Sequence, residues 1–165
     1  MAKSSVGKRP AVRRARRPAT PAVAPAAAAI RYIESSALLA ALLEGDAAAL
    51  AALRAGGRRI TSVLTVAEAT RAVIRARAMG RMTAPQEQAA IRAIQAFARR
   101  CDLVEVTDAV LGRVGRPFPV EPVRTLDAVH LATAEALGEP PQLLTIVTQD
   151  HRVRDNARAL GYIVD

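Results

Sequence analysis

The sequence predicts an α/β fold with three layers, α/β/α, in which helices cover both faces of a mostly parallel central sheet of about four or five short strands. Short apolar runs alternate with amphipathic segments from residue 30 onward, as strands alternate with helices in such folds. Acidic residues follow two of the apolar runs, at Glu34 and Asp150, where parallel sheets place their ligands. A chain of 165 residues allows one ordinary domain.

The first part of the domain is predicted to contain two strands and two helices. Residues 30–34 form the first strand, and Ser35 or Ser36 is expected to cap the following helix, which carries a stripe of leucines: Leu38, Leu39, Leu42 and Leu43. Asp46 is expected to cap the second helix, which ends at Gly56 and Gly57. Residues 59–62 form a second, weaker strand.

The middle of the chain is predicted to be a helical hairpin packed on the sheet. Its first helix spans about residues 65–79 and ends at Gly80, and its second begins at Pro85 and continues to about residue 100. The apolar residues that face inward on the second helix are Ile91, Ile94 and Phe97. Residues 103–106 form the third strand.

The last part alternates helices and strands again. Asp108 opens a short helix, which ends near Gly112 or Gly115, and the proline-rich residues 117–122 form a loop. A helix that contains Asp127 then precedes a strand over residues 143–147, a helix over about 150–160 and a short strand over 162–164. This order gives a mostly parallel sheet with right-handed crossovers.

The charge of the chain is concentrated at its N-terminus. Residues 1–29 contain no acid and contribute +7 to the formal net charge of +9; the basic residues there are Lys3, Lys8, Arg9, Arg13, Arg14, Arg16 and Arg17. This segment is rich in Ala and Pro, so we expect residues 1–29 to be a disordered basic arm and residues 30–165 to be the domain. Three readings of the arm stay open: a solvated extension or a start codon assigned too early, a nonspecific binder of RNA or DNA phosphates, and a targeting signal.

Two further features bear on the compartment. Cys101 is the single cysteine, so no intramolecular disulfide can form, which fits a cytoplasmic location. No uninterrupted apolar stretch approaches the length of a membrane span, which argues against a membrane protein.

Four carboxylates are the candidate site: Glu34, Glu68, Asp127 and Asp150. Two ionised carboxylates about 4 Å apart repel by roughly 4 kcal/mol at an effective dielectric constant near 20, so a cluster of four needs shared protons or a bound cation. Oxygen ligands without a group of Cys or His residues favour Mg²⁺ or Mn²⁺. Metal-assisted hydrolysis of a phosphodiester is the natural chemistry of such a site.

Each carboxylate also has a plain structural reading. Asp127 can be a first-turn acid that favours the helix dipole, and Asp150 can be a helix N-cap. Glu68 lies one turn from Arg71 and can form an ordinary salt bridge. Glu34 ends a buried strand, which is a costly place for an unpaired charge, so its functional reading is the stronger one.

Three stretches resemble the signature regions of PIN-domain nucleases, in particular the VapC-type toxins of bacterial toxin-antitoxin pairs. They are residues 32–39 (YIESSALL), 124–134 (RTLDAVHLATA) and 147–150 (VTQD), of which the second is the most specific. The resemblance covers roughly residues 30–165, which leaves only the arm outside, and it implies a PIN-like fold.

The resemblance also implies a site and partners. Glu34, Glu68, Asp127 and Asp150 match the four acids of the family in order, and Ser36 and Thr148 match hydroxyls that line the pocket. In such enzymes one or two Mg²⁺ or Mn²⁺ ions held by the acids activate water for attack on an RNA phosphodiester. Family members commonly form homodimers and are silenced by a cognate antitoxin. His130 is expected to be a hydrogen-bonded packing residue, because the family uses acids for metal.

One residue departs from the family pattern. The first acid is usually Asp, and Glu34 reaches one methylene further, which can shift a metal by about an ångström and cost on the order of 10²-fold in rate. Glu34 keeps the charge and the oxygen ligand, so we expect metal binding to survive. Taken together, the four acids and the resemblance predict a metal-dependent endoribonuclease toxin. The alternatives are an inactive PIN-like module that binds nucleic acid or a partner, and a housekeeping RNA-processing or DNA-acting nuclease.

Overall fold

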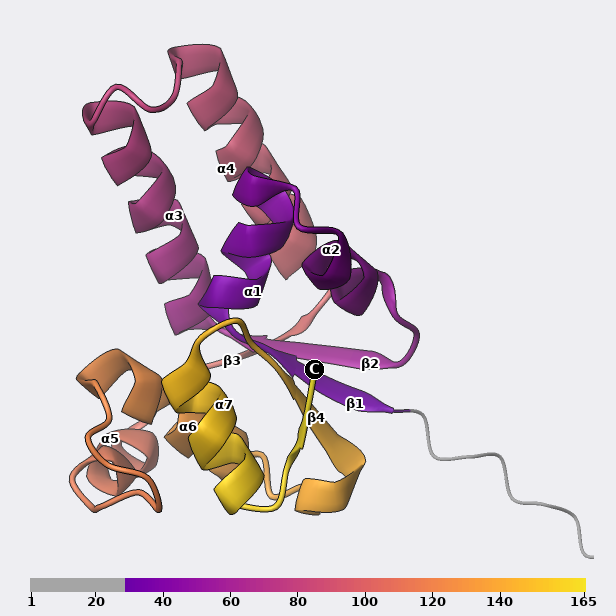
Figure 1. The fold of residues 1–165 in the computed structure, drawn as a ribbon, viewed down its shortest axis with the longest axis vertical. Coiled ribbons are helices and arrows are strands. Elements are labelled where there is room, and N and C mark those ends of the chain that lie inside the picture. The colour runs from indigo at the N-terminus through magenta and orange to yellow at the C-terminus, as the bar shows by residue number, and fades with distance from the viewer. Residues whose placement is uncertain (1–28) are drawn as a thin grey trace, which may run out of the picture.

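The five strands in the described part of the chain lie in one parallel sheet (Figure 1). The computed structural model describes residues 29–165, so the predicted basic arm lies, except for Ala29, outside the described residues. The strand order is β3-β2-β1-β4-β5, and every neighbouring pair is parallel. The strands are β1 (Ile30–Ile33), β2 (Arg58–Ser62), β3 (Asp102–Val104), β4 (Leu144–Val147) and β5 (Ile163–Val164). The predicted α/β class and the short strands are confirmed, and the sheet is wholly parallel.

Helices cover both faces of this sheet, as predicted for a three-layer fold. On one face lie α1 (Ser35–Leu39), a π-helical turn η1 (Ala40–Glu44), α2 (Ala47–Arg54), α3 (Val63–Ala78) and α4 (Ala84–Ala98). On the other lie α5 (Asp108–Val114), α6 (Thr125–Ala136) and α7 (His151–Ala159), and a 3₁₀ turn, η2 (Pro141–Leu143), precedes β4. The helices α3 and α4 form the predicted hairpin (Figure 1).

The core is divided by the sheet into two apolar clusters. Tyr32 and Ile33 are adjacent in β1 and point to opposite faces, and each is 0% exposed. Tyr32 packs with residues of α5, α6 and α7, whereas Ile33 packs with residues of α1 to α4. Strands buried on both faces are expected to be continuous apolar runs, which is why β1 and β4 could be recognised in the sequence.

The register of the central strands positions the candidate site. Ile33 at the end of β1 is paired with Val147 at the end of β4, so the residues that follow, Glu34 and Thr148, emerge side by side. Ser62 ends β2 on the other side of β1 and leads directly into α3. The carboxyl ends of three neighbouring strands therefore meet at one edge of the sheet.

Several helix boundaries differ from the predicted ones for reasons of capping. The expectation that Ser35 or Ser36 caps the first helix is wrong: Glu34 is the N-cap, and its carboxylate accepts a hydrogen bond from Ser36 N at 3.0 Å. Ser62 Oγ accepts from Thr65 N at 3.1 Å, which starts α3 two residues earlier than predicted. The predicted cap at Asp46 is confirmed, with Ala49 N donating to its carboxylate at 2.7 Å.

The proline-rich connection before α6 is a loop, as predicted, and polar side chains hold it in place. Asn156, 0% exposed in α7, accepts from Val120 N at 2.9 Å and donates to Val120 O at 2.8 Å. The Glu121 carboxylate accepts from the backbone N–H groups of Phe118 and Val123 at 2.9 and 2.7 Å, and these hydrogen bonds lower the pKa of Glu121. These contacts fix the path of the chain into the helix that carries Asp127.

The turn before β2 depends on a glycine. Gly57 has a φ of +115°, and a Cβ atom at this position would lie 2.1 Å from Ala29 O. The same carbonyl accepts a hydrogen bond from Arg58 N at 3.0 Å, which begins the pairing of β2 with β1. A side chain at Gly57 would therefore push apart the two strands where their pairing starts.

Within residues 29–165 no single helix is both long enough and apolar enough to cross a membrane. The segments Ser35–Glu44 and Ala47–Arg54 meet the criterion of length and composition only as a pair, and this pair is bent by 119°.

Candidate functional site

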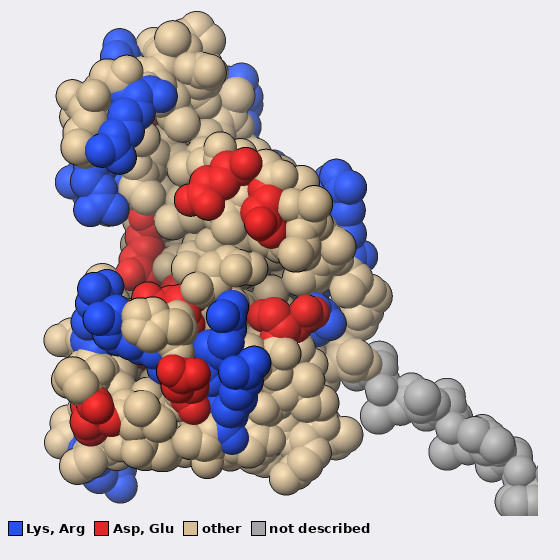
Figure 2. All heavy atoms as spheres, in the orientation of Figure 1, with Lys and Arg blue, Asp and Glu red and all other residues tan. Residues whose placement is uncertain are grey.

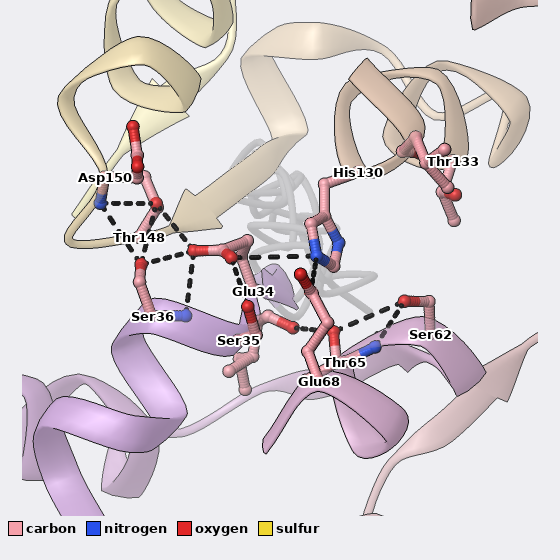
Figure 3. Close-up of polar contacts among 12 residues, drawn as sticks. Glu34, Ser35, Ser36, Ser62, Thr65, Glu68, His130, Thr133, Thr148 and Asp150 are labelled. Carbon is pink, nitrogen blue, oxygen red and sulfur yellow. Dashed lines mark hydrogen bonds and ion pairs between the residues drawn. The ribbon is translucent and has the colours of Figure 1, made fainter. Parts of the chain in front are cut away.

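The candidate site lies at the carboxyl edge of the sheet, where segments distant in sequence come together (Figure 3). Glu34 and Ser36 come from the junction of β1 and α1, and Thr148 and Asp150 come from the junction of β4 and α7. Glu68 projects from the second turn of α3, and Asp127 lies in the first turn of α6. The site is thus built at strand ends and helix starts.

Glu34 is the most deeply buried of the four carboxylates, at 4% exposed. Its Oε1 atom accepts from Ser35 Oγ at 2.6 Å, and its Oε2 atom accepts from Ser36 N at 3.0 Å and from Thr148 Oγ at 2.9 Å. Ser36 Oγ donates to the same Oε2 atom. Buried polar atoms are costly unless they are hydrogen-bonded, and these donors give both oxygens of the carboxylate partners.

Ser36 links the two strand ends through its hydroxyl group. Its Oγ atom donates to Glu34 and accepts from Gln149 N at 2.8 Å and Asp150 N at 3.1 Å. Thr148 Oγ also accepts from Asp150 N at 3.1 Å. The two predicted hydroxyls therefore lie between the first and the fourth acid and hold the carboxylate of Glu34 and the backbone of Asp150, as residues behind a ligand set do.

Asp150 is the N-cap of α7, which was the plain structural reading of this residue. Its Oδ1 atom accepts from Arg152 N at 2.7 Å. Within residues 29–165, no hydrogen bond is made to the second oxygen of this half-buried carboxylate, and Figure 3 shows the carboxylate above the Ser36 and Thr148 hydroxyls. Capping and a role in the site are compatible, because capping uses one of the two oxygens.

Glu68 is joined to His130 rather than to Arg71. His130 Nε2 lies 2.7 Å from Glu68 Oε2 and 3.6 Å from Glu34 Oε1, and its Nδ1 atom lies 2.9 Å from Tyr32 Oη. Burial acts to raise the pKa of Glu68, but the hydrogen bond and electrostatic attraction of His130 outweigh it and hold that pKa below its ordinary value. Glu68 is therefore ionised at neutral pH.

Asp127 has an unpaired oxygen inside the protein. Its Oδ2 atom is buried and has no hydrogen-bond partner among the described residues. Burial raises the pKa of Asp127 above its ordinary value, and the negative charges of Asp150 and Glu34 raise it further, whereas Arg124 and His130 oppose these effects. Asp127 is therefore electrostatically coupled to the first and fourth acids.

The structure joins five of the six predicted site residues through hydrogen bonds and the contacts of His130, and the sixth, Asp127, is coupled to them by charge. Glu34, Ser36, Thr148 and Asp150 form one hydrogen-bonded group, Glu68 joins it through His130, and Asp127 is coupled to it by charge. His130 is a hydrogen-bonded buried residue, as predicted, but sequence reasoning missed that it contacts two of the acids. It also missed the Tyr32 contact. The signal for His130 was its position three residues after Asp127, on the same helical face.

The residues of this site fit a hard divalent cation. One ligand atom from each of Glu34, Glu68 and His130 lies within 4.8 Å of the other two, and the orphaned Asp127 oxygen supplies a further acceptor. Figure 2 shows acidic groups in the indentation between the α3–α4 hairpin and the helices α5, α6 and α7, with basic side chains on both sides of it. Such an arrangement suits a cation at the centre and phosphates around it.

Comparison with known proteins identifies the family of this chain. The sequence matches the model of the PIN domain family over residues 31–159. It is 36% identical over 137 residues to Ribonuclease VapC35 of Mycobacterium tuberculosis, an alignment that covers 81% of this chain and 93% of that protein.

Solved structures share the fold at lower identity. VapC20 of Mycobacterium tuberculosis, a toxin that cleaves the sarcin-ricin loop, has a TM-score of 0.58 and 16% identity, with 81% of this chain and 96% of that chain covered. VapBC2 of Rickettsia felis, bound to a DNA fragment from its promoter, has a TM-score of 0.56 and 15% identity, with 82% and 97% covered. The family match and the identity to VapC35 show that this chain belongs to the PIN-domain family, in its VapC-type group.

Proposed function

We propose that this protein is a divalent-metal-dependent endoribonuclease that hydrolyses RNA phosphodiester bonds as the toxin of a type II toxin-antitoxin pair. The observation that carries the proposal is the convergence of four acids from four separate segments on one edge of the sheet. A single structural role does not explain this convergence, because Asp127 leaves an oxygen buried and unpaired. A bound cation supplies the partner that this oxygen lacks.

We assign Glu34, Glu68, Asp127 and Asp150 as the groups that hold Mg²⁺ or Mn²⁺. The ion supplies Lewis acidity and an activated water at the scissile phosphodiester. Ser36 and Thr148 position the Glu34 carboxylate and the Asp150 backbone, with hydrogen bonds of 2.9 Å to Glu34 and 3.1 Å to Asp150 N. The carboxylates lie near one another, so their own charge discourages the approach of an RNA phosphate until a cation is present.

The partners in this proposal follow from the relatives. VapC35 is a ribonuclease, and VapBC2 is a structure of a VapB and VapC pair on promoter DNA, so we propose an RNA substrate and a cognate antitoxin for this chain. We also propose that the protein forms a homodimer, as is common in this family. We propose that it acts in the cytoplasm, where its RNA substrate would be found. The proposal predicts a small reading frame for an antitoxin immediately upstream of this coding sequence.

RNA cleavage with a matched pair of variants tests the proposal. Asp127→Asn removes a proposed ligand oxygen, whereas Asp108→Asn removes an acid of the same kind from the first turn of α5, where it is exposed. We expect Mn²⁺ or Mg²⁺ to support cleavage of a mixed RNA substrate by the wild type and by Asp108→Asn, and EDTA to stop it. We expect Asp127→Asn to fold and to cleave at least about 10²-fold more slowly. Equal cleavage by the two variants would remove Asp127 from the site.

A second function is favoured by one observation, the state of Glu34. Its carboxylate is 4% exposed and its two oxygens accept hydrogen bonds from Ser35, Ser36 and Thr148. A ligand held so firmly by protein donors suits a PIN-like module that binds RNA without cleaving it.

Glu34→Asp discriminates the two functions. The shorter side chain withdraws from the hydroxyls and restores the acid usual in the family. Under the nuclease proposal the wild type cleaves RNA with Mn²⁺. Under the module proposal the wild type binds RNA without cleaving it, and the Glu34→Asp variant gains cleavage activity. Binding is measured by fluorescence anisotropy in EDTA and in Mn²⁺, so that affinity and cleavage are separated.

A further inference from the structure

Three exposed arginines flank the acid cluster, and no role in the proposed chemistry has yet been assigned to them. They are Arg71 and Arg75 of α3 and Arg124 at the start of α6. We propose that these arginines bind RNA phosphates on the two sides of the scissile bond, so that the strand crosses the acid cluster from α3 to α6. The position of the scissile bond rests on the proposed function, whereas the binding of RNA by these arginines does not.

Arg71 does not form the salt bridge that its position in the sequence allows. It lies three residues after Glu68, one turn along α3, where a pair of opposite charges can form. The Glu68 carboxylate instead lies 2.7 Å from His130 Nε2. Among residues 29–165 the exposed Arg71 guanidinium has no acid and no hydrogen-bond partner, so it is available to an anion.

Arg71 and Arg75 continue the face of α3 that carries Glu68. Residues at i, i+3 and i+7 share one side of a helix, and a rise of about 1.5 Å per residue puts the two arginines roughly 4.5 and 10.5 Å further along the axis. Arg75 is also exposed and unpaired in the described part of the chain, whereas Arg77 lies 3.8 Å from Glu87. Figure 2 shows basic side chains over the α3–α4 hairpin, beside the acidic indentation. The two arginines therefore form a short positive track that leads away from the site.

Arg124 lies at a position where the helix itself does not favour a cation. It is the N-cap of α6, three residues before Asp127, and its exposed side chain makes no capping hydrogen bond. The positive end of the helix dipole is at this terminus, so a positive charge here is unfavourable. No ion pair with an acid offsets this effect among the residues that the structure describes. A role in binding explains an arginine whose place the fold does not require.

The alternative role of Arg124 is to offset the charge of the acids. Burial raises the pKa of Asp127, and the charges of Asp150 and Glu34 raise it further. The positive charge of Arg124 acts in the opposite direction and lowers it. An arginine with this role alone would affect the stability of the folded protein and would leave RNA binding unchanged, so the two roles differ in what they alter.

The arrangement of charges suits a nucleic-acid strand. Acids at the centre repel a phosphate until a cation is bound, whereas guanidinium groups on either side attract the phosphates of neighbouring nucleotides. A guanidinium group can donate two parallel hydrogen bonds to one phosphate. Contacts of this kind position the strand and do not read its sequence.

RNA binding by two matched triple variants of the full chain tests the proposal. The control removes three exposed arginines of α4, its C-cap and the last turn of α7, which lie outside the proposed track. The test variant combines Arg71→Gln, Arg75→Gln and Arg124→Gln, and the control variant combines Arg92→Gln, Arg99→Gln and Arg158→Gln. Both variants lose three positive charges and keep the seven basic residues of positions 1–29, so they differ only in where the charges are lost. Circular dichroism verifies that each variant is folded.

Fluorescence anisotropy with a short single-stranded RNA in EDTA measures the Kd at several salt concentrations. Near 0.1 M salt, we expect the test variant to bind at least about 10-fold more weakly than the control variant. The slope of log affinity against log salt should become shallower by about 2, since each phosphate contact on a single strand contributes about 0.7. The loss should be the same for two RNAs of unrelated sequence. Equal affinity and slope in the two variants overturn the proposal, and a loss confined to one sequence overturns the contact with phosphates.

Single variants of Arg124 separate RNA binding from the electrostatic role. Lys keeps the positive charge, so we expect Arg124→Lys to bind RNA within about threefold of the wild type and Arg124→Gln to bind it several-fold more weakly. The Tm in EDTA measures the effect on the acids. Unchanged RNA affinity in Arg124→Gln, at any Tm, overturns the role of this residue in binding.

Cleavage kinetics in Mn²⁺ distinguish a failure of this inference from a failure of the proposed function. Arginines that only bind RNA should raise KM when they are removed, with kcat within about threefold of the control variant. If the wild type binds RNA through these arginines and cleaves none, the nuclease assignment fails and the RNA-binding surface is supported. If the wild type cleaves RNA and the two triple variants have equal KM, the surface is overturned and the nuclease assignment is supported.

Discussion

Replacing Asp127 by Asn is expected to stabilise the protein when no metal is present. The Oδ2 atom of Asp127 is buried without a hydrogen-bond partner, and the charges of Asp150 and Glu34 act against its ionisation. An unsatisfied buried acceptor costs about 1–3 kcal/mol. Because Asp127 is only half-buried, solvent screens part of this cost, and we expect Asp127→Asn to raise the free energy of unfolding by about 1 kcal/mol. In a domain of this size that gain corresponds to roughly 4 °C in Tm.

The pH dependence of this gain has a definite sign. The pKa of Asp127 is higher in the folded protein than its ordinary value of 3.8. A raised pKa in the folded state gives stability that is fully present below the ordinary value and is lost as pH rises through the raised pKa. The wild type therefore carries the penalty at neutral pH and is relieved of it in acid. We expect the difference between Asp127→Asn and the wild type to be largest near pH 7 and to shrink as pH falls toward 4.

Thermal unfolding in EDTA and in Mg²⁺ is the assay. In EDTA, Asp127→Asn should melt above the wild type, and Asp108→Asn should melt with the wild type or slightly below it, because an exposed first-turn acid only favours the helix dipole. In saturating Mg²⁺ the order should reverse, because a ligand present at 100 times its Kd stabilises the protein that binds it by about 2.7 kcal/mol. An Asp127→Asn protein that melts below the wild type in EDTA would refute the strain assigned to this carboxylate.

Three further predictions concern the scaffold of the site. Gly57→Ala should lower the free energy of unfolding by about 3 kcal/mol, because its Cβ atom would collide with Ala29. Gly45 has a φ of +67° and nothing within 4 Å of an added Cβ atom, so Gly45→Ala should lower it by only about 1 kcal/mol. Urea unfolding measures both, and equal costs would contradict the contact with Ala29. Asn156→Ala should cost about 2 kcal/mol in the same assay, since it leaves the loop groups at 2.9 and 2.8 Å without partners; a neutral result would show that the loop is held by other contacts. Burial raises the pKa of Cys101 to about 11, so iodoacetamide at pH 8 should alkylate the native chain up to about 100-fold more slowly than the urea-unfolded chain, by mass spectrometry, and equal rates would contradict it.

The sheet and its ligand edge were predictable because they depend on short-range patterns. The apolar runs of β1 and β4 are buried on both faces, so they stand out in the sequence, and the acids that follow them must emerge at the carboxyl edge. The same reasoning correctly brought Glu34 and Asp150 together. It could not decide which side chain caps α1, because Glu34, Ser35 and Ser36 all offer an oxygen, and tertiary contact with Thr148 made Glu34 the cap.

Contacts between distant segments were the part that the sequence did not reveal. His130 is three residues from Asp127, so its place on the helix was visible, but its contacts with Tyr32 and Glu68 span 98 and 62 residues. The anchoring of the loop by Asn156 spans 36 residues in the same way. Such pairs depend on how α3, α6 and α7 are packed on the sheet. Periodicity predicts the faces of these helices but not which polar residues meet between them.

The pairing of β1 with β4 determines at which point of translation the proposed active site can form. The first acid emerges from the ribosome early, but the strand that lies beside it and the hydroxyl of Thr148 are 114 residues further along the chain. A nascent chain that stalls before Leu144 contains β2 but has neither β4, the other neighbour of β1, nor Asp150. Under the proposed function, we expect such a fragment to have no ribonuclease activity, so that activity begins only when translation is almost complete.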